Sequence, residues 1–169
     1  MPVQFLLLAA AVAATQTPPL AAASGCASVE DRQFDFWVGR WDVYAFAKPD
    51  RKVAESLIER RYKGCAIWEN WQPGTDGGGS LSSYAPAEKV WKQTWVDNTG
   101  SRADFTGGWT GKAMILTGIW PQPDHPTQLT RMTYAPLPDG GVRQMGETSD
   151  DRGKTWQPSF DFIYRKAKD

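Results

Sequence analysis

The stretch that decides the fold is Phe36-Trp37-Val38-Gly39-Arg40-Trp41-Asp42-Val43. Aromatic and β-branched residues, which favour strands, are concentrated in it. The preceding residues, Val29 to Phe34, are expected to form only a short helical turn, and no convincing long helix follows anywhere in the chain. We therefore predict that this stretch opens the first strand of an all-β domain.

Turn signals recur at short and nearly regular intervals after this stretch. Each cluster contains Gly, Pro, Asn or Asp, which tolerate the dihedral angles of turns. The clusters are Lys48-Pro49-Asp50 and residues 73–79, 85–88, 97–100, 111–112, 121–126, 138–141 and 150–153. The segments between them are rich in Trp, Tyr, Phe, Val, Ile and Thr, so many short strands are expected, in a sandwich or a barrel.

Apolar residues alternate with polar ones in several of these segments. The pattern is clear in Val90 to Asp97, Arg102 to Trp109 and Pro158 to Tyr164. A period of two with one polar face is typical of an antiparallel sheet curled around a core. We also assign Glu55 to Tyr62 to a strand rather than to a short helix.

Gly39-x-Trp41, at the start of the first expected strand, resembles the signature of lipocalins and the wider calycin barrels. In those proteins the Trp closes one end of the barrel and the Gly lets a neighbouring backbone come close. An Arg near the end of the last strand stacks over the Trp, and Arg165 lies where the resemblance would place it. The resemblance implies a single closed antiparallel up-and-down barrel of about eight to ten strands. It would span residues 24–169 as one domain.

Longer segments resemble a family of secreted bacterial proteins of unknown function with a lipocalin-like fold. The segments that carry this resemblance are Gln33 to Val43, Gly64-Cys65-Ala66, Trp91 to Asn98, Val142-Arg143-Gln144 and Tyr164-Arg165. The resemblance covers nearly the whole chain after residue 24. It implies the barrel and no known activity.

The N-terminus has the pattern of a secretory signal peptide. An apolar run from Phe5 to Ala14 is about half the length that a membrane-spanning helix needs. Small residues at Ala21 and Ala23 satisfy the cleavage pattern, so we predict a signal peptide over residues 1–23. The protein is then expected to be secreted or periplasmic.

The chain has two cysteines, Cys26 and Cys65. In an oxidising compartment an even pair favours a disulfide. An alternative remains, because Ala23-Ser24-Gly25-Cys26 resembles a bacterial lipobox, in which Cys26 would be lipidated and anchor the protein. The disulfide is the favoured interpretation, since the lipobox alternative leaves Cys65 unpaired.

Charge and composition exclude several classes of function. The 19 basic and 19 acidic residues balance, which gives no electrostatic reason to expect nucleic acid or an anionic membrane as a partner. The chain has one histidine, His125, and neither a phosphate loop, nor a dinucleotide fingerprint, nor a serine-hydrolase elbow. No metal or other cofactor is expected. A closed barrel has no free sheet edges, so a monomer is favoured.

Residues Ser149 to Trp156 match the Asp-box pattern S-x-D-x-G-x-T-W at every position. In this motif the Asp carboxylate accepts hydrogen bonds from turn amides, the Gly adopts a positive φ, and the Trp covers the hairpin. We predict a structural hairpin between the last two strands, formed by Ser149, Asp151, Gly153 and Trp156.

The chain contains nine tryptophans, which could either fill the barrel or line a cavity within it. We favour a cavity that holds a small apolar or aromatic molecule. The expected ligand-binding residues are Trp68, Trp91, Gln93, Trp95, Phe105 and Trp109, with Arg131 and Glu147 as weaker candidates for a polar head group. Two alternatives are an enzyme that uses Glu69 or Glu147 as acid or base beside Arg131, and a structural envelope protein with a filled barrel.

Overall fold

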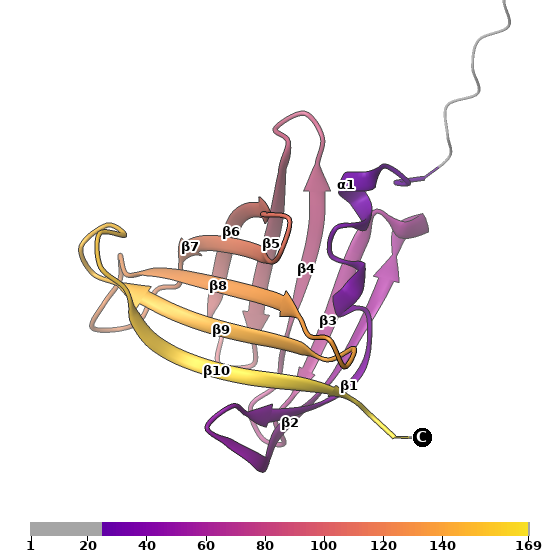
Figure 1. Cartoon of the computed structure of the whole chain (residues 1–169). Helices are drawn as coiled ribbons and strands as arrows, with labels where there is room; N and C mark the ends of the chain where they lie inside the picture. The colour runs from indigo at the N-terminus through magenta and orange to yellow at the C-terminus, as the bar shows by residue number, and fades with distance from the viewer. Residues whose placement is uncertain (1–24, 169) are drawn as a thin grey trace, which may run out of the picture.

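The computed structural model describes residues 25–168, which form a closed antiparallel barrel of ten strands (Figure 1). The strands follow one another around the barrel in chain order, and β1 closes it by pairing with both β2 and β10. This confirms the predicted all-β, up-and-down barrel. The predicted signal peptide, residues 1–23, lies outside the described residues. Within the described range, no helix is long and apolar enough to cross a membrane.

A short helix, α1 (Val29–Arg32), precedes the barrel, as expected. The 3-10 helix η1 (Asp35–Trp37), which was not predicted, follows it, so the first strand begins only at Gly39. The strands are β1 (Gly39–Ala45), β2 (Lys48–Arg61), β3 (Ala66–Gln72), β4 (Gly78–Ala85), β5 (Val90–Asp97), β6 (Arg102–Trp109), β7 (Met114–Ile119), β8 (Leu129–Pro136), β9 (Val142–Ser149) and β10 (Gln157–Lys166). A further 3-10 helix, η2 (Tyr62–Gly64), joins β2 to β3.

One predicted turn is displaced. The chain turns at residues 46–47, and Lys48-Pro49-Asp50 already belongs to β2. Pairing with β3 begins only at Glu55, so the first residues of β2 form a sheet edge on that side. A proline is tolerated at an edge because its missing N–H removes no ladder hydrogen bond.

The segment before β1, residues 25–38, closes one end of the barrel, and we call it the N-terminal plug. Phe34 and Trp37 are both 0% exposed, and their rings stack with centroids 4.8 Å apart. Trp41 in β1 donates from Nε1 to the carbonyl oxygen of Trp37 at 2.8 Å. Aromatic burial of this kind fixes the plug on the barrel, with the Trp41 N–H satisfied, although the buried Nε1 of Trp37 has no hydrogen-bond partner among the described residues.

The cation over Trp41 is Lys166 and not Arg165, which corrects the prediction. Lys166 lies directly opposite Trp41 in the β1–β10 register, and its Nζ lies 3.7 Å from the ring centroid. Arg165 pairs with Asp42, on the other face of the sheet, and covers the Tyr44 ring instead. Neighbouring residues on a strand point to opposite faces, so a shift of one position decides which cation reaches the Trp. Gly39 provides the room, because a Cβ there would lie 2.4 Å from the Lys166 Nζ.

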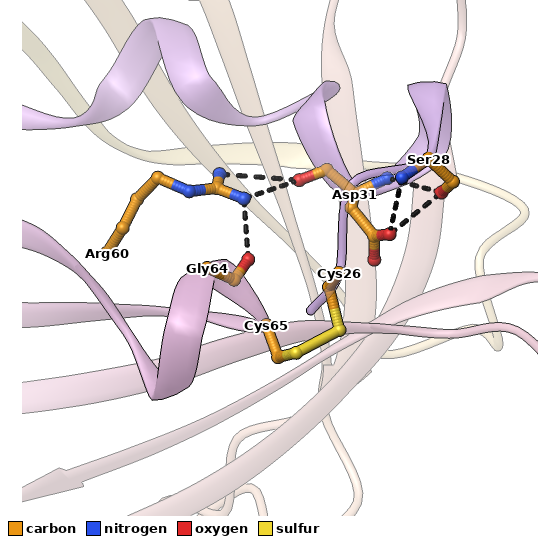
Figure 2. The surroundings of a disulfide bond; sticks show 6 residues. All are labelled: Cys26, Ser28, Asp31, Arg60, Gly64 and Cys65. Carbon is orange, nitrogen blue, oxygen red and sulfur yellow. Dashed lines mark hydrogen bonds between the residues drawn. A yellow bond between two sulfur atoms is a disulfide. The ribbon is translucent and has the colours of Figure 1, made fainter. Parts of the chain in front are cut away.

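A disulfide between Cys26 and Cys65 ties the plug to the β2–β3 connection, as predicted (Figure 2). Arg60 reinforces it by donating to the carbonyl oxygens of Asp31, at 3.1 Å, and Gly64, at 2.6 Å. Arg60 also forms an ion pair with Asp35. The Sγ of Cys26 is therefore engaged by Cys65, which contradicts the alternative in which that sulfur carries a lipid.

The Asp-box forms the β9–β10 hairpin, as predicted. Asp151 Oδ1 accepts from the backbone amides of Lys154 and Thr155, each at 2.9 Å, and from Ser149 Oγ at 2.8 Å. The Thr155 hydroxyl also donates to Asp151 Oδ2 at 2.6 Å. These hydrogen bonds, led by that of the Thr155 hydroxyl, lower the pKa of Asp151 to about 2. Gly153 has a φ of +82°, and Trp156 donates from Nε1 to its carbonyl oxygen. The motif is a structural turn in this barrel.

Replacing Asp151 with Ala is expected to loosen this turn without unfolding the barrel. Two backbone amides and two hydroxyls lose a charged acceptor, so exchange of the Lys154 and Thr155 amide hydrogens should accelerate at least about tenfold. Hydrogen exchange followed by NMR measures this directly. Asp150→Ala is the matched control, because the Asp150 carboxylate accepts from Gln128 and His125 outside the turn. Equal acceleration in both variants would contradict the assigned role of Asp151.

Candidate functional site

The barrel encloses a cavity of about 230 Å³. The plug covers the end of the barrel that carries the β2–β3 turn, and the cavity extends toward the other end, where β3 joins β4 and β5 joins β6. Its lining comes from every strand between β3 and β10 except β4 and β7, together with the residue that follows β7. The lining residues are Glu69, Trp71, Gln93, Trp95, Phe105, Trp120, Met132, Tyr134, Gln144, Phe160, Phe162 and Tyr164.

Two tryptophans on one side of the cavity are held by hydrogen bonds at the barrel rim. Trp95 donates from Nε1 to Asp97 Oδ2 at 3.1 Å, and Trp120 donates to Ser101 Oγ at 2.9 Å. Their ring centroids lie 5.9 Å apart. Because each indole N–H is already satisfied by the wall, the ring surface left to the cavity is apolar.

Three aromatic rings form the opposite side. Phe160 and Phe162 stack with centroids 5.2 Å apart, and Trp71 contacts Phe162 at 5.6 Å. Phe160 fits because β9 has a glycine opposite it: a Cβ on Gly146 would lie 2.2 Å from the Phe160 ring. We call these three residues, with Trp95 and Trp120, the aromatic wall.

A carboxyl group lies at the bottom of the cavity. Glu69 is 3% exposed, and it accepts hydrogen bonds from Ser80 Oγ at 2.8 Å and from Ser56 Oγ at 3.5 Å. Burial raises its pKa to about 7, although the hydroxyl groups of Ser80, Ser56 and Tyr164 act in the opposite direction. Both protonation states of Glu69 are therefore populated near neutral pH.

Buried amides and phenols surround Glu69. Gln93 donates to Ser82 Oγ at 2.9 Å and accepts from the Tyr134 hydroxyl at 3.4 Å. The Tyr164 hydroxyl donates to Gln144 Oε1 at 2.5 Å. Burial and the nearby Glu69 charge raise the pKa of both tyrosines well above the usual range, so they stay neutral and can donate hydrogen bonds. We call Glu69, Gln93, Tyr134, Gln144 and Tyr164 the polar floor.

Gln93, Trp95 and Phe105 line the cavity, as the sequence predicted. Trp91 and Trp109 do not, although Trp91 shares the inner face of β5 with Gln93 and Trp95. Trp91 lies one inward position nearer the plug, where it contacts Phe34 edge-on and donates to Gln33 Oε1 at 3.1 Å. Trp109 likewise packs on Phe36 of the plug, with centroids 5.5 Å apart. The cavity therefore lies farther from the plug than predicted, because the rings of Trp91 and Trp109 fill the closed end of the barrel.

Trp68, Arg131 and Glu147 were also expected at the ligand, and the structure places all three on the outer face. Glu69 points inward, so its neighbour Trp68 points outward and is 48% exposed. Arg131 and Glu147 lie opposite each other in the β8–β9 register and form an ion pair at 2.7 Å. Arg131 also covers the Trp156 ring, with its Cζ 4.1 Å from the centroid. The predicted pairing of a cavity carboxylate with Arg131 is therefore wrong.

Most of the lining was not predicted from the sequence. The inward positions of β10 follow the alternation already visible in Pro158 to Tyr164, which could have identified Phe160, Phe162 and Tyr164. Glu69 was predicted as a possible acid or base and was not among the expected ligand-binding residues. On a strand, Glu69 and Trp71 share one face and Trp68 lies on the other. Since each face carries a tryptophan, the sequence does not indicate which face points into the barrel.

Comparison with known proteins gives no further assignment. No protein-family model matches the chain, and no curated protein matches its sequence.

Proposed function

We propose that this protein is an exported barrel that binds a small apolar or aromatic molecule. The observation that carries the proposal is the 230 Å³ cavity, which joins the aromatic wall to the buried polar floor. Ligand sites are mostly apolar, with a few polar groups that fix orientation. Aromatic rings fill the end of the barrel that the plug covers, as they would in a barrel with a purely structural role. The other end retains a cavity with room for a ligand.

Export is part of the same proposal. The Cys26–Cys65 disulfide supports it, because such bonds persist in oxidising compartments. The resemblance to secreted bacterial proteins with a lipocalin-like fold, together with the signal-peptide pattern of residues 1–23, favours the same compartment.

The binding site can be tested with N-phenyl-1-naphthylamine, a neutral aromatic dye whose emission rises in apolar surroundings. We expect the wild-type protein to bind it and Trp95→Ala to weaken binding at least about tenfold, because a central aromatic contact is lost. Trp68→Ala is the matched control, since it makes the same change on the outer face. Far-UV circular dichroism establishes that both variants are folded, and fluorescence titration gives the dissociation constants.

Two results would count against the proposal. If the wild-type protein does not bind the dye, the cavity is not a site for aromatic molecules and a structural role is favoured. If Trp68→Ala weakens binding and Trp95→Ala does not, the dye binds the outer surface of β3 and the cavity plays no part.

Glu69 favours a second candidate, an enzyme in which this carboxyl group exchanges a proton with a bound substrate. Its pKa of about 7 suits a general acid or base at neutral pH. Native mass spectrometry of the protein from its own source would identify a bound compound. Conversion of that compound by the wild-type protein, but not by Glu69→Gln, would support the enzyme. An unchanged compound would leave the binding role.

A further inference from the structure

We propose that the ligand carries a positively charged nitrogen, which binds Glu69 at the polar floor while its apolar part contacts the aromatic wall. This inference rests on the proposed binding function and specifies the chemical class of the ligand. An aromatic or arylalkyl amine is the simplest molecule of this class.

The charges of the lining residues favour a cation. Among the twelve lining residues, Glu69 is the only carboxylate, and none is Lys, Arg or His. The hydrogen-bond partners of Glu69 are the hydroxyl groups of Ser56 and Ser80, which solvate a carboxylate without neutralising it. A buried charge without an ionic partner is costly, so a ligand that supplies the positive charge gains more than a neutral one.

The rings next to Glu69 suit a cation as well. Trp71 packs on Tyr164, with centroids 6.2 Å apart, and on Phe162 at 5.6 Å. The Tyr164 hydroxyl is one of the groups that lower the pKa of Glu69, so these rings border the carboxyl group. Aromatic faces attract cations, and the attraction is stronger where water is excluded. An anion would meet both the Glu69 carboxylate and the negative ring faces, so carboxylate ligands are expected to bind worst.

The ionisation of Glu69 sets the expected pH dependence. The groups that face it are Ser56 from β2, Ser80 from β4, Tyr134 from β8 and Tyr164 from β10. Of these only the tyrosines titrate, and both remain neutral because burial raises their pKa. Since the pKa of Glu69 in the free protein is about 7, amine binding should tighten as pH rises through that value.

Three probes of similar shape separate charge from hydrophobicity: 2-phenylethylamine, 2-phenylethanol and 3-phenylpropanoate. Isothermal titration calorimetry at pH 8 should give an affinity order of amine, alcohol and acid, with the amine at least about tenfold above the alcohol. In Glu69→Gln the amine should lose at least about tenfold, while the alcohol changes less than about threefold. Glu147→Gln makes the same substitution on the outer face and should leave all three affinities unchanged.

The outcomes distinguish this inference from the proposed function. If the alcohol binds the wild-type protein as well as the amine does, or if Glu69→Gln weakens both equally, the cation assignment is wrong and the binding function stands. If none of the three binds while N-phenyl-1-naphthylamine does, the cation assignment is again wrong. If that dye fails as well, the binding function itself is wrong. The wild-type affinity order tests the inference even if Glu69→Gln does not fold.

Discussion

Removing the disulfide in the double variant C26S/C65S is expected to lower the free energy of unfolding by about 4 kcal/mol. The two cysteines are 39 residues apart in sequence. Closing a loop of about 40 residues restricts the unfolded chain, and the chain-entropy relation gives roughly that value at 25 °C. Typical domains have only about 5–15 kcal/mol in total, so this loss would be a large share of the stability.

The structure also predicts where the loosening begins. The disulfide holds the plug at its N-terminal side, and Arg60 holds it through Asp31 (Figure 2). Arg60 also forms an ion pair with Asp35 of the plug. Without the covalent bond, the plug is still held by the Arg60 hydrogen bonds, by the buried rings of Phe34 and Trp37, and by side-chain contacts of Gln33 and Phe36 with the barrel. We therefore expect the amides of residues 25–38 to lose protection from hydrogen exchange before those of the barrel strands.

Urea unfolding, followed by circular dichroism, measures the stability loss. The wild-type protein in a reducing buffer should behave as the double variant does, and the same buffer should leave the double variant unchanged. A loss below about 1 kcal/mol would mean that the unfolded chain gains little freedom when the bond is removed. The entropic account of the disulfide would then be wrong.

The barrel could be predicted because its signals are local and repeated. Turn clusters, the alternation in segments such as Arg102 to Trp109, and the Asp-box each depend on a few neighbouring residues. The Asp-box was predicted in detail because one carboxylate, Asp151, makes most of the motif's hydrogen bonds, all with residues no more than four positions away.

The cavity could be predicted only in part, because it depends on where the plug ends. Alternation identifies Trp91, Gln93 and Trp95 as sharing a face, but not which of them lies under Phe34. That depends on the three-dimensional path of residues 25–38. The errors at Arg165 and Trp68 come from strand register. Each is adjacent to the residue that faces the barrel interior, Lys166 and Glu69 respectively, and therefore lies on the outer face. Single-sequence patterns constrain such positions weakly.

The second large effect concerns pH and Glu69. Its pKa is about 7 in the folded protein, against an ordinary value of 4.5, because burial disfavours the charged form. The folded state therefore holds the proton more tightly than the unfolded state does. The stability associated with the protonated carboxyl group is fully present below pH 4.5 and is lost as pH rises through 7. From pH 5 to pH 8 the loss should be about 2–3 kcal/mol.

Glu69→Gln should remove this component, because glutamine does not titrate. The difference in unfolding free energy between the variant and the wild type should therefore shift by about 2–3 kcal/mol between pH 5 and pH 8, in favour of the variant at the higher pH. Urea unfolding at several pH values gives the two curves. Glu147→Gln is the control for general effects of losing a carboxylate, and its curve should run parallel to that of the wild type.

The same measurement bears on the ligand, because a bound cation acts on the charged form of Glu69. An amine that binds the carboxylate should restore stability mainly above pH 7, where the empty cavity is least favourable, and should have little effect at pH 5. A wild-type curve parallel to that of Glu69→Gln would show that Glu69 ionises as readily in the folded barrel as in the unfolded chain. The carboxyl group would then be hydrated in the folded protein. A cationic ligand would gain little over a neutral one, and the pH effect would be absent as well.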